Sequence, residues 1–240
     1  MKVFINSPEK LAQAAGQRYV ELLNEKPNAV LGYATGSTPL HLYAELARLN
    51  KAGAMSFARA TTFNLDEYIG LPGTHDQSYR YFMDKNLFDL IDIPKENTHV
   101  PSGLGNSEQV ALAYEAAIHA AGGIDLQLLG IGHDGHIGFN EPGTPFGSIT
   151  HPVELNPMSI QANSRFFASI DEVPKSAITM GVKTIMNARS IIFVATGADK
   201  AEIVKKTLQG PVTEEVPASI LQLHPFVEFY IDEGAASLLQ

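Results

Sequence analysis

The chain of 240 residues contains no cysteine. This absence excludes a disulfide scaffold and a thiolate nucleophile, and it agrees with a cytoplasmic location, which we expect. No apolar run approaches the roughly 18 residues that cross a membrane. The N-terminal segment turns polar by Asn6, so it does not have the apolar region of a signal peptide.

Positive charge is also scarce. The 17 Lys and Arg residues are outnumbered by 26 Asp and Glu residues, which gives a formal net charge of −9. A strongly acidic balance argues against nucleic acid or an anionic membrane as a partner. If the ligand carries a phosphate, a few local cations and backbone N–H groups must hold it against the overall field.

Hydrophobic residues make up 45% of the chain and charged residues 18%, the balance of an ordinary globular protein. The length suits one larger α/β domain or two small ones. We find no linker, repeat or low-complexity tract, so we expect a single domain over residues 1–240. One irregular stretch, 142–157, is rich in proline, and long loops of this kind are often functional. We therefore expect a lid-like segment around 142–165.

Apolar, β-branched runs alternate along the chain with helical patterns of about ten residues or more. This alternation predicts a Rossmann-like three-layer α/β/α sandwich with a mostly parallel sheet. The expected strands are Lys2–Ile5, Ala29–Ala34, Arg59–Leu65, Asp125–Ile131, Ser190–Thr196 and Phe226–Ile231, and the expected helices are Pro8–Asn24, Pro39–Leu49, Ser78–Leu90, Ser107–Ala121 and Asp199–Leu208.

The most informative segment is Leu128–Gly143, LLGIGHDGHIGFNEPG, in which an apolar run ends in a glycine-rich turn. Such a strand end opens into the crevice where α/β sheets place their ligands. Asp134 lies two residues from His136, so it can orient the imidazole and favour its protonated form. Glu141 supplies a third group that can transfer protons. Each of these residues alone is more often structural, but together they predict an active-site loop.

A zinc site is the alternative for the same loop, because His133, Asp134 and His136 could all bind the metal. The chain has no cysteine, no HExxH helix and no second histidine pair at ligand spacing. We therefore predict neither a metal nor any other cofactor.

A second glycine-containing turn, GYATGSTP at Gly32–Pro39, lies where an expected strand meets an expected helix. Gly36 permits a tight turn, and the hydroxyls of Ser37 and Thr38 lie beside the free N–H groups of a helix start, which is a typical anion site. A plain Ser/Thr helix cap is the alternative. The sequence ATG recurs at Ala195–Gly197, followed by Lys200, so two such sites would suit a substrate with a phosphate at one end.

Two further segments carry charged side chains. FNLDEYIGL at Phe63–Leu71 places Asp66 and Glu67 at a strand end, and adjacent strand residues face opposite sides, so at most one carboxylate should enter a given crevice. NSRFF at Asn163–Phe167 contains Arg165, whose guanidinium could bind a phosphate through two hydrogen bonds. In isolation, an acidic turn and a surface arginine are the more common interpretations.

GYATGSTP, FNLDEYIGL, LGIGHDGHIGFNEPG and NSRFF, in this order, resemble the glucosamine-6-phosphate deaminases, and the resemblance extends from about Val3 to Ile231. It implies an enzyme of amino-sugar catabolism that converts glucosamine 6-phosphate and water to fructose 6-phosphate and ammonium. By this resemblance Asp66 would be the base between C2 and C1, and His136 would open the sugar ring with support from Asp134 and Glu141. The 6-phosphate would be bound by Gly36, Ser37, Thr38, Arg165 and Lys200.

Two other functions remain open at this stage. One is a hydrolase similar to the 6-phosphogluconolactonases, and the other is a non-catalytic sugar-phosphate sensor. The resemblance also concerns regulation: members activated by N-acetylglucosamine 6-phosphate carry two basic residues shortly after the NEP motif, where this chain has His151 and Val153. We therefore expect a non-allosteric enzyme that is a monomer, with a small homo-oligomer as the alternative.

Overall fold

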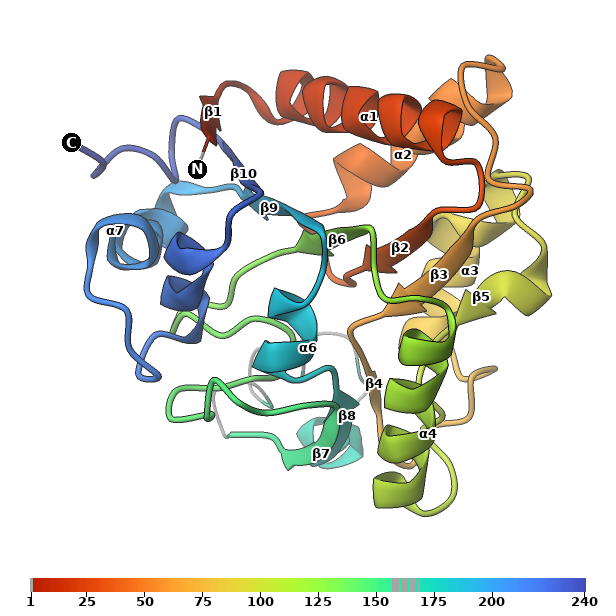
Figure 1. Cartoon of the computed structure of the whole chain (residues 1–240). Coiled ribbons are helices and arrows are strands. Elements are labelled where there is room, and N and C mark those ends of the chain that lie inside the picture. The colour runs from red at the N-terminus through yellow and green to blue at the C-terminus, as the bar shows by residue number, and fades with distance from the viewer. Residues whose placement is uncertain (1, 157–159, 161–163, 165–166, 168) are drawn as a thin grey trace.

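The computed structural model describes residues 2–156, 160, 164, 167 and 169–240. Its central element is a seven-stranded, fully parallel sheet with the strand order β1-β10-β9-β6-β2-β3-β5. Helices cover both faces of this sheet (Figure 1), so the predicted α/β class with a mostly parallel sheet is confirmed. The strands are β1 (Lys2–Ile5), β2 (Val30–Tyr33), β3 (Thr61–Asn64), β5 (Thr98–His99), β6 (Leu126–Leu129), β9 (Ser190–Ala195) and β10 (Val227–Ile231).

Two hydrophobic clusters fill the space between the sheet and the helices. One cluster packs α1, α2 and α3 against one face of the sheet, and the other packs α4, α6 and α7 against the opposite face. Because both faces are covered, strands such as β2 are apolar along their whole length and fully buried. The helices are α1 (Pro8–Glu25), α2 (Leu40–Lys51), α3 (Tyr79–Asn86), α4 (Ser107–Ala120), α6 (Val182–Met186) and α7 (Ala201–Gln209).

A second sheet, with three antiparallel strands in the order β4-β8-β7, lies at one end of the molecule (Figure 1). Its strands are β4 (Asp66–Tyr68), β8 (Ser176–Thr179) and β7 (His151–Glu154). The sequence analysis missed this sheet and was wrong to treat 142–157 as wholly irregular. The strands have only three or four residues. The edge strand β7 contains Pro152, and an edge strand tolerates proline because the position without an N–H can face the side that has no neighbouring strand.

The two sheets are joined at Leu65. Its N–H donates to the carbonyl of Tyr33 in the large sheet, and its carbonyl accepts from the N–H of Met180, which follows β8. Asp66 is the next residue and pairs with Thr179 across the small sheet. The position of Asp66 is therefore fixed by both sheets.

The strands β2 and β6 are neighbours in the sheet, and the chain adds further strands on opposite sides of this pair. From β2 the chain proceeds outward through α2 to β3, whereas after β6 the parallel sheet is extended on the other side by β9 and β10. In open α/β sheets, ligands bind at such a switch point, beyond the carboxyl ends of the strands. No helix of the described chain is both long and apolar enough to span a membrane.

Candidate active site

A cavity of about 240 Å³ lies at this switch point. The turns after β2 and β6 form much of its wall, as the sequence predicted, and further residues come from three other segments. The lining residues are Ala34, Thr35, Gly36, Ser37, Thr38, Leu65, Asp66, Tyr79, Gly130, Ile131, Gly132, His133, His136, Gly138, Phe139 and Lys200.

Asp66 is the most deeply buried charged side chain of this wall. It is 6% exposed, and among the described residues none donates a hydrogen bond to its carboxylate. Burial, and then the negative charge of the adjacent Glu67, raise the pKa of Asp66 to about 8. Glu67 does not line the cavity, so the expected opposite orientation of the two carboxylates is confirmed. A buried carboxylate with a raised pKa and no partner is suited to accept a proton from a ligand.

His136 lies on the same cavity and is held by Asp134. The imidazole Nδ1 is 2.7 Å from Asp134 Oδ1, and the same oxygen accepts the backbone N–H of His136 at 3.1 Å. Although partial burial acts in the opposite direction, these contacts lower the pKa of Asp134 to about 2. A carboxylate on Nδ1 leaves Nε2 to exchange a proton with a ligand, so the predicted base–orienter pair is present.

Gly132 is required for this arrangement. A Cβ at this position would lie 2.1 Å from the Cε1 of His136, and the Gly132 N–H donates to the His136 carbonyl at 3.0 Å. The backbone of the turn therefore passes so close to the imidazole that any side chain at position 132 would displace the ring. This close approach explains one glycine of the segment Leu128–Gly143.

The turn after β2 offers a site for an anion. Gly36 has a positive φ of 95° and no atom within 4 Å of its missing Cβ, so the backbone is open toward the cavity. Within the described chain, no group accepts a hydrogen bond from the N–H groups of Gly36, Ser37 or Thr38. These three residues precede α2, where free N–H groups and the helix dipole favour negative charge.

Lys200 approaches the cavity from the turn after β9. Its ammonium donates to the carbonyl of Ile131 at 3.0 Å. Burial lowers the pKa of Lys200, while the carboxylates of Asp199 and Asp134 act in the opposite direction. A partly buried lysine with only a carbonyl as hydrogen-bond partner gains from the arrival of an anionic group.

Among the predicted site residues that the structure describes, two do not line the cavity: Asp134, which contacts His136 Nδ1, and Glu141. Glu141 is half-buried, and its Oε1 accepts the N–H of Asn156 at 3.2 Å, which links the NEP turn to the residues after β7. Arg165 lies outside the described residues.

The sequence analysis assigned no role to Tyr79, Thr35 or Phe139, which line the cavity. An aromatic residue at the first position of a helix carries no chemical motif, so only the fold could reveal that Tyr79 faces the cavity. The analysis also considered His133 only as a possible metal ligand. Its Nε2 lies 2.7 Å from Asp199 Oδ2 at the rim of the cavity. Within the described chain no three His, Asp or Glu side chains are grouped closely enough to hold a metal ion.

Known proteins share this chain's sequence over nearly its full length. Residues 6–227 match the model of the family described as glucosamine-6-phosphate isomerases/6-phosphogluconolactonase. A glucosamine-6-phosphate deaminase of Clostridium perfringens is 51% identical, with 97% of this chain and 96% of the relative covered. The corresponding protein of Hahella chejuensis is also 51% identical, with 100% and 92% covered.

Solved structures give the same result at the level of the fold. A monomeric glucosamine-6-phosphate deaminase superposes with a TM-score of 0.96 at 46% identity, with 99% of this chain and 100% of that chain covered. A 6-phosphogluconolactonase from Trypanosoma brucei superposes with a TM-score of 0.79 at 22% identity, with 100% and 98% covered, which shows a shared fold only. The chain therefore belongs to the glucosamine-6-phosphate isomerase/6-phosphogluconolactonase family and, within it, to the glucosamine-6-phosphate deaminases.

Proposed function

We propose that Asp66 and His136 carry out the isomerising deamination of glucosamine 6-phosphate in the cavity at the switch point. The products are fructose 6-phosphate and ammonium. One observation carries the proposal: a buried carboxylate to which no described residue donates a hydrogen bond and a histidine held by a carboxylate line the same cavity. An aldose–ketose conversion needs these two groups, one at the sugar carbons and one at the ring oxygen.

The reaction begins with ring opening. His136 takes the proton of the O1 hydroxyl and passes a proton to the ring oxygen, so that the C1–O5 bond breaks and the open-chain aldehyde forms. Asp134 holds the imidazole by Nδ1 and stabilises its charged form during this transfer. We assign Glu141 a supporting role toward His136, on the basis of the family resemblance and its place in the same loop.

Asp66 then removes the proton from C2, which gives an enolamine, and returns a proton to C1. The resulting iminium at C2 is hydrolysed by water, and ammonia leaves. The substrate's C2 ammonium group favours the ionised form of a carboxylate beside it, so substrate binding itself lowers the raised pKa of Asp66. An N-acetylated sugar lacks this charge and does not lower the pKa of Asp66 in this way.

The phosphate is placed at the turn after β2. The unpaired N–H groups of Gly36, Ser37 and Thr38 and the ammonium of Lys200 would bind it, and Arg165 joins this set by resemblance alone. Phosphate binding supplies energy remote from the reacting carbons, which aligns C1 and C2 with Asp66.

An ammonium-release assay with three compounds, together with a separate lactone-hydrolysis assay, tests this function. We expect turnover of glucosamine 6-phosphate, no ammonium from its N-acetylated analogue and very slow release from free glucosamine, which lacks the phosphate. Addition of 6-phosphogluconolactone should not produce accelerated hydrolysis. Binding of glucosamine 6-phosphate in calorimetry without turnover would instead favour the sensor, and rapid lactone hydrolysis would favour the lactonase.

We propose further that the chain acts as a monomer in the cytoplasm, as expected from the sequence and supported by the 46% identical monomeric deaminase. His151 and Val153 lie in β7, where the Nδ1 of His151 is hydrogen-bonded to the carbonyl of Ile149 at 2.7 Å. A valine cannot bind a phosphate, so substrate curves should be hyperbolic and insensitive to N-acetylglucosamine 6-phosphate. Light scattering and initial rates measure both properties. Sigmoidal curves that become hyperbolic with the acetylated sugar phosphate would contradict this prediction.

The lid over 142–165 also stays a prediction. Its described beginning is held in place, because the N–H groups of Gly143 and Phe146 donate to the carbonyl and the carboxylate of Glu214, respectively. The N–H of Lys183 donates to the carbonyl of Ser148. Any closing movement would therefore have to leave these contacts of residues 143–148 in place or break them.

A further inference from the structure

Glu67 is a second buried carboxylate directly beside Asp66. It is 1% exposed and faces away from the cavity, on the opposite side of β4. Both of its oxygens accept hydrogen bonds from backbone N–H groups: Oε1 from Tyr68 and from Tyr79, each at 2.9 Å, and Oε2 from Arg80 at 3.0 Å. All three contacts are donated to Glu67, which is the arrangement that an ionised carboxylate requires.

These hydrogen bonds fix the beginning of α3. The N–H groups of Tyr79 and Arg80 are the first two of the helix, and Ser78 Oγ accepts the third, from Tyr81. A negative charge at a helix N-terminus is stabilised by the free N–H groups and the helix dipole. Ser78 already caps the start of α3. The additional hydrogen bonds to Glu67 therefore connect α3 to β4, the strand that contains Asp66.

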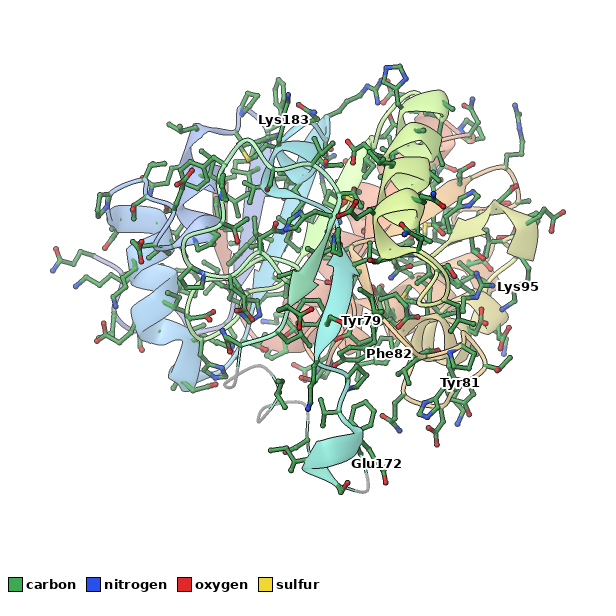
Figure 2. All side chains as sticks on the ribbon, turned by 90° about the horizontal axis from the view of Figure 1, so that it is seen from below. Tyr79, Tyr81, Phe82, Lys95, Glu172 and Lys183 are labelled. Carbon is green, nitrogen blue, oxygen red and sulfur yellow. The ribbon has the colours of Figure 1, made fainter. Side chains whose placement is uncertain are left out.

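Tyr79 is the residue through which this connection reaches the cavity. Its ring lines the wall and stacks on Phe139, with ring centroids 6.1 Å apart and planes 9° apart. Figure 2 shows Tyr79 at the end of α3 nearest the small sheet, with Phe82 beside it. The backbone N–H of Tyr79 donates to Glu67, so the carboxylate fixes the position of Tyr79 relative to Asp66.

Glu67 also determines the charge around Asp66. The ionisable groups near Asp66 on the packed elements are the phenols of Tyr43 on α2, Tyr79 on α3 and Tyr114 on α4. Burial raises the pKa of all three phenols well above its usual value, so they stay neutral. The strand β8 contributes no ionisable side chain, and His136 and Lys200 share the cavity wall. Among the described residues, Glu67 is the one whose negative charge raises the pKa of Asp66.

We propose that Glu67 is a positioning residue for the deamination: its carboxylate fixes Tyr79 at the cavity wall and places a negative charge directly behind Asp66. The inference rests on the proposed role of Asp66 as the base. A base acts in its ionised form, and a neighbouring negative charge makes a carboxylate hold a proton more tightly. In the wild-type protein, kcat/KM should therefore rise with pH through about 8, the pKa of Asp66.

Glu67→Gln tests the proposal, because the amide keeps the size and one acceptor oxygen but removes the charge. We expect the rise of kcat/KM to move to lower pH by about one unit, the effect of one nearby charge. An NMR titration of the Asp66 carboxyl in the ligand-free protein should shift in the same direction. Glu67→Asp keeps the charge, so the Asp66 titration should stay near its wild-type position.

Asp92→Asn is the matched control. The Asp92 carboxylate also accepts three hydrogen bonds, from Asn50, Ser56 and the N–H of Phe57, but it lies outside the cavity. This variant should leave the titration of Asp66 unchanged. An unchanged Asp66 titration in Glu67→Gln, with a rate reduced equally at all pH values, would show a purely structural role and overturn the proposal.

A wild-type measurement keeps the test decisive even if Glu67→Gln does not fold. The proposal requires Glu67 to ionise at lower pH than Asp66, and NMR titration of the wild-type carboxyls measures this order directly. Burial raises the pKa of Glu67 above its usual value, and its three N–H donors offset only part of this rise. A Glu67 that stays protonated while Asp66 ionises would overturn the proposal. If Asp66 shifts in the titration but the rate profile does not, the role of Asp66 as the base fails instead.

Discussion

Replacing Asp66 by asparagine is expected to lower kcat for ammonium release by about 10²–10⁴-fold, the usual contribution of a general base. The amide keeps the shape of the buried side chain but cannot accept the C2 proton. Because the proposed phosphate site lies on other elements, the affinity for glucosamine 6-phosphate should fall by much less than kcat does. Steady-state rates and calorimetry on the same preparation measure both effects.

The matched control for this prediction is again Asp92→Asn, which removes a hydrogen-bonded carboxylate outside the cavity. Its kcat should equal that of the wild-type protein. If Asp66→Asn kept more than about half of the wild-type rate, another group would have to be the base, since loss of a general base costs at least about 10²-fold.

Replacing His136 by glutamine is expected to lower kcat by about 10²-fold or more, because the side chain can no longer exchange a proton with the sugar's O1 and ring oxygen. Glutamine keeps a donor and an acceptor, so loss of binding should be small by comparison. Rates measured with glucosamine 6-phosphate at saturation test the prediction.

His119→Gln serves as the control, since this histidine is exposed near the end of α4 and does not line the cavity. It should leave the rate unchanged. A His136→Gln variant with nearly full kcat would mean that ring opening needs no help from the protein, and the proposed role of His136 would be wrong.

The sequence predicted the parts of the site that depend on local structure. A buried apolar strand followed by a glycine-rich turn identifies a strand end, and parallel strands bring their carboxyl ends to one edge of a sheet. The turns after β2 and β6 could therefore be recognised without the fold. Alternation along a strand was also sufficient to separate Asp66 from Glu67.

Other features depend on residues far apart in the sequence. The small sheet pairs β4 with β8 and β8 with β7, and none of these strands is long enough to show a period of its own. Its formation follows from tertiary packing, which overrides local propensity. The same applies to Tyr79: it lines the cavity, and its backbone N–H donates to Glu67, but neither contact could be seen in a single aromatic residue.

The junction at Leu65 has a consequence for how the protein acquires activity during synthesis. Asp66 takes its position by pairing with Thr179, and the cavity further requires Lys200 from the turn after β9. Domains emerge from the ribosome N-terminal end first, so β2, β3 and their helices are available well before β8 exists. A nascent chain that ends before Thr179 contains Asp66, the proposed base, without the strand that pairs with it. We therefore expect the protein to become active only late in synthesis, when both sheets have assembled. An incomplete chain would not form a working site around the carboxylate of Asp66.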